Sequence, residues 1–283
     1  MIKFKRSVMG VAVCCALAST GAQAAFTSFW FDADGAGATA TAFRVDEFFD
    51  ISGRFLAQNT YNANPPNNTY TFNQFGTAGI TGRDSLGFSG LSAGTQAQTQ
   101  AVRAKFFGSG TGDLNSLSVS FNPTGFMEFY NPAYTTMFAQ FAITGGSGVT
   151  LLGIPNGFST LIGKAASISA GYFFADNGGF MGADLACTFC ANPDIFNFAT
   201  TNVSEITSQN TRNGVDLQLT AAYSDAAVQG ANGLRLNDAF GRPTQLYASA
   251  NGQDRMQIPE PGSMALLGLG LVGLAAMRRR AAK

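Results

Sequence analysis

Five acidic side chains near the start of the chain form its densest group of potentially reactive residues. Asp32 and Asp34 stand in the pattern Asp-x-Asp-Gly, and Asp46, Glu47 and Asp50 follow within sixteen residues. Calcium prefers carboxylate oxygens in tight glycine turns, so Asp32 and Asp34 predict a calcium site, with a plain Asp/Gly turn as the alternative. Two carboxyl groups about 5 Å apart on facing strands would instead serve a retaining glycosidase.

Histidine is absent from the 283 residues. This excludes a Ser-His-Asp triad, a Cys-His dyad and a zinc site with histidine ligands. Carboxylate-pair glycosidases need no histidine, so an enzyme of that class remains an alternative. Our main interpretation is a protein that is not an enzyme and that has no cofactor, apart from the calcium ion considered above.

Two cysteines, Cys187 and Cys190, form a Cys-x-x-Cys pair in the body of the chain. A thioredoxin-like redox site would need a βαβ context, and half of a zinc site would need a second pair of ligands. Neither requirement is met by the sequence. We therefore predict a local structural disulfide, which is typical of proteins in an oxidising compartment.

Phenylalanine dominates the aromatic residues, with 26 Phe against seven Tyr and one Trp. Surfaces that bind carbohydrate usually present Trp and Tyr, whose polar edges stay in water while the ring faces make contacts. The abundance of Phe instead indicates a well-filled core. Trp30 and Tyr61 are the side chains that we would expect to touch a polysaccharide.

The N-terminus has the form of an export signal. Three basic residues precede an apolar run from Val8 to Leu17, and Ala22-Gln23-Ala24 then supplies an Ala-x-Ala cleavage site. The pattern predicts a signal helix over residues 1–24, with cleavage between Ala24 and Ala25.

The C-terminus consists of three consecutive elements. They are the motif Pro259-Glu260-Pro261, an uncharged run from Gly262 to Met277, and the basic cluster Arg278-Arg279-Arg280. As a helix, the sixteen-residue run reaches about 24 Å, slightly less than the ~30 Å hydrocarbon core of a bilayer. Basic residues after an apolar helix mark the cytoplasmic side. A buried core helix is the alternative to a membrane span.

This ordered combination of Pro-Glu-Pro, glycine-rich apolar helix and arginine cluster resembles the PEP-CTERM sorting signal. The resemblance covers only about 25 residues of the chain. It implies a Gram-negative, exopolysaccharide-producing bacterium and an exosortase, a membrane-embedded cysteine transpeptidase, as partner. It also implies an inner-membrane intermediate, removal of the helix near the motif, and delivery to the cell surface or extracellular matrix.

The body of the chain is also similar, over roughly half its length, to flocculation-associated PEP-CTERM proteins. The similarity lies in Phe26–Gly37, Val45–Phe48, Phe75-Gly76 and Leu117–Pro123, with their aromatic-Asp-Gly spacing. It implies a role in retaining extracellular polysaccharide around cells.

Strand-like alternation with turn residues about every ten positions characterises the body, as in Leu117, Val119 and Phe121 on one face. This predicts an all-β fold, namely an antiparallel β-sandwich of the jelly-roll kind, over residues 25–257. The predicted order is therefore a signal peptide (1–24), a secreted β domain (25–257) and a sorting signal (258–283).

The net charge of the body narrows the range of partners. Between Ala25 and Ile258, ten basic residues stand against sixteen acidic ones, which gives −6, although the whole chain is neutral. Such a body is poorly suited to nucleic acid. Our interpretation is an exported surface or matrix protein that supports exopolysaccharide-linked cell aggregation, as in flocs or biofilm. The alternative is a carbohydrate-binding module or carboxylate-pair enzyme that uses Asp32, Asp34, Asp46 and Glu47.

Overall fold

The structure is a computed structural model, and it describes residues 28–37, 40–151, 156–188, 197–205, 222–224 and 235–257. The predicted signal helix and sorting helix lie outside these ranges. Within them the fold is antiparallel β with one short helix, so the predicted all-β class is confirmed. The elements are β1 (Phe29–Phe31), β2 (Phe43–Val45), β3 (Phe48–Tyr61), β4 (Thr69–Arg83), α2 (Ala93–Ala101), β5 (Arg103–Asp113), β6 (Ser118–Tyr130), β7 (Met137–Leu151), β8 (Asn156–Ile168), β9 (Phe173–Asn177), β10 (Phe180–Asp184), β11 (Cys187–Thr188), β12 (Asn197–Glu205), β13 (Arg235–Asn237) and β14 (Pro243–Gln257).

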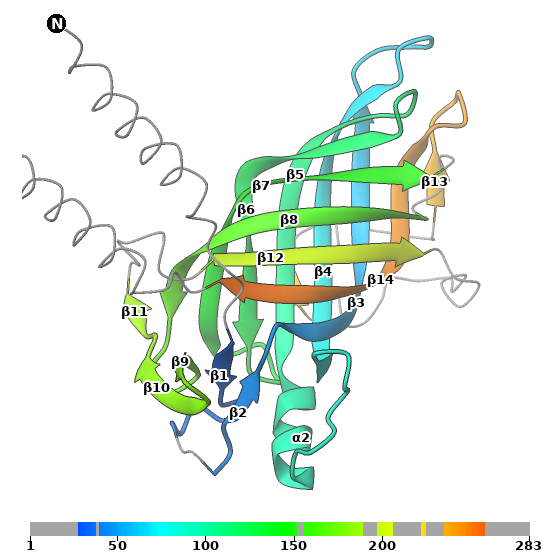
Figure 1. Cartoon of the computed structure of the whole chain (residues 1–283). Coiled ribbons are helices and arrows are strands. Elements are labelled where there is room, and N and C mark those ends of the chain that lie inside the picture. Colours follow the sequence, from blue (N-terminus) through cyan, green and yellow to red (C-terminus); the bar gives the residue numbers. More distant parts are fainter. Residues whose placement is uncertain are drawn as a thin grey trace, which may run out of the picture.

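The larger sheet closes on itself. Its strands follow the order β8-β12-β14-β3-β4-β5-β6-β7, and β7 pairs again with β8 (Figure 1). Two walls of strands therefore face each other across one apolar interior, as the predicted sandwich requires, and they are joined at both sides. Closure pairs the backbone groups that an open sheet would leave exposed at its edges.

Alternation along each strand separates the interior from the outer surface. On β3, Phe49, Ile51 and Phe55 are buried inside, whereas Ser52 and Arg54 are exposed. Directly opposed residues of antiparallel strands share a face, so the interior row continues from strand to strand around the ring. Glycines admit the large rings: a Cβ added at Gly110 would lie only 2.6 Å from Cζ of Phe72.

A second sheet of four strands, in the order β10-β9-β1-β2, covers one end of the closed sheet. Figure 1 shows these strands at that end, together with α2. We call it the small-sheet end. The β3–β4 turn (residues 62–68) and the β13–β14 turn (residues 238–242) lie at the opposite end, which we call the hairpin end.

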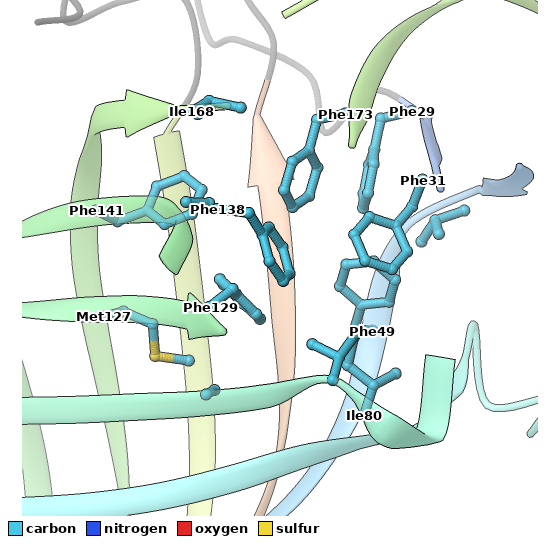
Figure 2. Close-up of a cluster of buried hydrophobic side chains, with 14 of the residues drawn as sticks. Phe29, Phe31, Phe49, Ile80, Met127, Phe129, Phe138, Phe141, Ile168 and Phe173 are labelled. Carbon is cyan, nitrogen blue, oxygen red and sulfur yellow. The ribbon is translucent and has the colours of Figure 1, made fainter. Parts of the chain in front are cut away.

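The main core lies where the small sheet meets the closed sheet. The Phe31 ring is completely buried, and its centroid lies 5.0 Å from those of Phe49 and Phe173 and 6.3 Å from that of Phe138. Figure 2 shows these rings converging from β1, β3, β7 and β9. The abundance of Phe is thus explained by this core, as the composition predicted.

Candidate functional site

The acidic pair of the Asp-x-Asp-Gly pattern lies in the turn that follows β1. Asp32 is completely buried. Asp34 accepts hydrogen bonds from the backbone N–H of Ala36 (2.9 Å) and from Nε2 of Gln98 on α2 (3.1 Å). These bonds shape the turn and join it to the helix. In the described part of the chain, we find no group of three or more Asp, Glu, Cys or His side chains that could hold a metal. Calcium at Asp32 and Asp34 stays a prediction.

The other predicted acids take part in a turn that is organised by Asp84. The Asp84 carboxylate accepts backbone N–H groups from Asp46 (2.9 Å), Glu47 (2.7 Å) and Phe48 (3.1 Å). Asp46 also forms an ion pair with Arg44. Sequence reasoning missed Asp84, because nothing local marks a residue that caps a turn 36 to 38 positions away.

Asp50 belongs to the same region through a different contact. Its Oδ2 accepts the backbone N–H of Ser85 (3.1 Å). Burial raises the pKa of the Asp50 carboxyl, and the neighbouring charge of Asp84 acts in the same direction, although the bond from Ser85 opposes both. These contacts are therefore those of an acidic region that holds loops in place at the small-sheet end.

Trp30 is held by a polar network on the small sheet. Asp176 accepts hydrogen bonds from Nε1 of Trp30 (2.9 Å), Oγ of Ser28 (2.8 Å) and the Arg44 guanidinium (3.1 Å). Burial would raise the pKa of the Asp176 carboxyl, but the bonds from Arg44, Ser28 and Trp30 outweigh it, so the pKa is lowered. The Trp30 indole N–H is thus engaged inside the protein, and only part of this side chain is open to a polysaccharide.

The Asp176 network predicts an acid-sensitive contribution to stability. Because the folded-state pKa lies below the ordinary 3.8, this contribution is complete only well above that ordinary value and disappears as the pH falls through the lowered pKa. We expect the free energy of unfolding to decrease over that range, together with a change in Trp30 fluorescence, which is specific because the chain has one Trp. Asp176→Asn should remove this part of the pH dependence. Identical pH profiles for the two proteins would contradict the assignment.

At the hairpin end, Arg242 joins the two turns. Its guanidinium donates to Asp238 (2.7 Å) and to the backbone carbonyls of Ala63 (2.8 Å) and Asn67 (2.9 Å). It also lies 4.1 Å from the ring centroid of Tyr61, the second aromatic residue that was predicted to meet polysaccharide. Nearby Phe240 is 54 % exposed, so an aromatic surface is presented at this end.

A buried carboxylate also lies on the outer wall of the closed sheet. Glu128 is only 7 % exposed, and it accepts hydrogen bonds from the Tyr130 hydroxyl (2.8 Å) and Nε2 of Gln140 (2.7 Å). Burial, with a further contribution from Glu128, raises the pKa of the Tyr130 hydroxyl above its ordinary value. Both carboxylate oxygens have donors, as a structural group of this kind requires.

The closed sheet also contains a hollow of about 50 Å³, and its lining includes Phe55, Gly76, Phe106 and Leu161. Sites for small molecules usually measure about 300 to 1,000 Å³. The lining of the hollow also includes the polar side chains of Gln74, Thr77 and Ser159. The hollow is therefore large enough for water but too small for a sugar.

The structure describes one of the two cysteines of the predicted disulfide. Cys187, on β11, is disulfide-bonded. Cys190 lies outside the described residues, so the pairing of Cys187 with Cys190 stays a prediction.

The sorting elements follow the last strand without an intervening segment. β14 ends at Gln257, which is paired with Asn197 of β12, and Pro259 is two residues further along the chain. The predicted cleavage site at Ala24 and Ala25, the motif Pro259-Glu260-Pro261 and the basic cluster at 278–280 lie outside the described residues. No helix among the residues that the structure describes is long and apolar enough to cross a membrane.

Comparison with known proteins identifies this C-terminal region. The PEP-CTERM protein-sorting motif matches residues 257–280, so the match begins at the final residue of β14. No curated protein and no solved structure matches the chain. The motif indicates an exported protein of Gram-negative bacteria that transits the membrane and is processed by an exosortase. The chain therefore carries a PEP-CTERM sorting signal attached directly to a closed β-sheet body.

Proposed function

We propose that this protein acts at the cell surface or in the extracellular matrix, where it supports exopolysaccharide-linked cell aggregation such as flocculation or biofilm formation. The observation that carries the proposal is the junction between body and signal. Because β14 ends where the matched motif begins, removal of the signal leaves every strand of the closed sheet in place. The sorting route thus delivers an intact, closed body to the outside of the cell.

Two properties of the body support a matrix role. The first is its closed sheet, which leaves few unpaired strand edges for uncontrolled association outside the cell. The second is the hairpin end, where Phe240 is 54 % exposed and Leu236 is 48 % exposed beside the ordered Arg242 and Tyr61. Exposed apolar side chains with polar neighbours are suited to contact with another macromolecule. Polysaccharide is the partner that we propose for this surface.

Deletion of the gene tests the proposal directly. We expect cells without the protein to lose aggregation while they still synthesise extracellular polysaccharide at the normal level, and the full chain should restore flocs. Aggregation of the deletion strain at the parental level would refute the proposed role, and loss of polysaccharide synthesis would place the protein in a different process.

The carbohydrate-active alternative is tested with the same material. The released protein should leave the length of purified exopolysaccharide chains unchanged in our proposal. Shortening of the chains, abolished by replacing Asp32 or Asp46 with asparagine, would instead establish a glycan-cleaving enzyme.

A further inference from the structure

The C-terminus of the body leaves the molecule at the small-sheet end. Near its end, β14 pairs through Asp254 with Phe49 and through Arg255 with Phe48, at the beginning of β3. The Phe49 ring in turn lies 5.3 Å from that of Phe29 on β1. The start of β14, by contrast, is at the hairpin end, where the Pro243 carbonyl accepts a hydrogen bond from Asn59 (2.9 Å).

The connection to the membrane segment is short. Only four residues, Ile258 to Pro261, separate Gln257 from the apolar run that begins at Gly262. Fully extended, the five steps from Gln257 to Gly262 span at most about 18 Å. A strand of fifteen residues such as β14 measures about 50 Å. While the apolar run is inserted in a bilayer, this short connection keeps the small-sheet end close to the membrane. The hairpin end, at the other end of β14, is then too far from the connection to take its place.

Among the residues that the structure describes, the two most exposed large apolar side chains lie at this same end. Phe180 is 76 % exposed and Leu86 is 61 % exposed. Phe180 follows the β9–β10 turn, whose Gly179 N–H donates to Asp176 (3.2 Å), the residue that binds Ser28 before β1. The Leu86 N–H donates to the Arg83 carbonyl (2.8 Å), and the Arg83 guanidinium donates to the Arg44 carbonyl of β2.

We propose that the small-sheet end is a membrane-contacting surface in the anchored precursor, with Phe180 and Leu86 placed in the interfacial layer of the bilayer and the hairpin end directed away from it. The inference rests on the membrane-transiting route and not on the aggregation role, so either can fail without the other. Arg44 is already paired with Asp46 and Asp176. The turns at this end also present the acidic side chains of Asp46, Glu47 and Asp84. Apolar contact, rather than attraction to anionic lipid, therefore carries the interaction, and neutral phosphatidylcholine is the appropriate bilayer.

Tryptophan scanning of the full chain in liposomes tests the orientation. The four variants are Phe180→Trp and Leu86→Trp at the small-sheet end, with Phe240→Trp and Leu236→Trp as equally conservative controls at the hairpin end. In liposomes of brominated phosphatidylcholine, a quencher located in the acyl chains, we expect quenching of the added tryptophan at positions 180 and 86 beyond that of the parent chain. Positions 240 and 236 should match the parent.

A lengthened connection supplies the second arm. Twenty Gly/Ser residues inserted between Gln257 and Ile258 would relax the tether to a root-mean-square span of about 25 Å with a wide distribution, so quenching at 180 and 86 should decrease. Quenching at the hairpin positions, equal quenching at all four, or none at 180 and 86 would overturn the proposal. If the tryptophans at positions 180 and 86 became shielded from solvent only after exosortase was added, the proposal would also be overturned. The enzyme rather than lipid would then cover this end.

Discussion

Replacement of Pro259, Glu260 and Pro261 by alanine should leave the precursor uncleaved and held in the inner membrane. The two prolines fix their φ angles and remove two backbone donors, so the motif is an extended segment that cannot join a helix. Alanine removes that restriction as well as the acidic side chain. The apolar run from Gly262 to Met277 is unchanged in this variant and would still insert.

Fractionation of cells that express this variant provides the measurement. We expect nearly all of the protein as full-length precursor in the inner-membrane fraction, and nearly none of the processed form outside. Asn251→Ala, an exposed position on the same β14 strand, is the matched control and should be processed normally. Normal surface delivery of the triple variant would show that export does not use the motif.

Phe31→Ala should cause the largest loss of stability among single substitutions in the small-sheet core. The ring is completely buried and contacts Phe49, Phe173, Phe43 and Phe138, which come from four different strands. Truncation of such a phenylalanine typically lowers the free energy of unfolding by about 3 to 5 kcal/mol, because apolar burial is lost and a cavity is left. Much of the attachment between the two sheets would be lost with it.

Urea unfolding of the processed protein, followed by the fluorescence of the neighbouring Trp30, measures this loss. Phe240→Ala removes the same ring from a position that is 54 % exposed and should change the free energy of unfolding by less than about 0.5 kcal/mol. Similar losses for the two variants would show that the small sheet does not contribute to the cooperative core.

The last strand of the body, β14, ends almost directly before the sorting motif. Its last residues are paired with β12, up to Gln257 against Asn197, and only Ile258 separates that pair from Pro259. An exosortase must therefore act on a chain whose folded part begins almost immediately beside the motif. The proposed membrane contact of the small-sheet end places body, motif and bilayer within this short distance.

The all-β class and the sorting elements could be predicted because their signals are local. Alternation with a period of two reveals which strands have one buried face, whatever their partners are. The Pro-Glu-Pro motif, the apolar run and the arginine cluster are likewise linear features, and the match at residues 257–280 confirms that part of the interpretation. Helix α2 was not predicted, since AGTQAQTQA contains an early glycine and has no apolar period.

The acidic region shows why the contacts of individual side chains could not be predicted from the sequence. The sequence indicated a cluster of carboxylates, but which groups they meet depends on strand order and register. Asp84 binds the backbone of residues 46–48 because the loop after β4 returns beside the start of β3. Asp176 binds Trp30 across 146 residues because β9 pairs with β1.

Short stretches of the chain therefore encode its export through a PEP-CTERM sorting signal and a body built from strands, so both could be predicted without knowing any long-range contact. Strand pairing and packing establish that the sheet closes through β7 and β8, that Asp84 caps the turn at residues 46–48 while Asp176 holds Trp30, and that β14 ends at the small-sheet end. Each of these depends on contacts between residues far apart in the chain, which are set by pairing register and packing rather than by local composition.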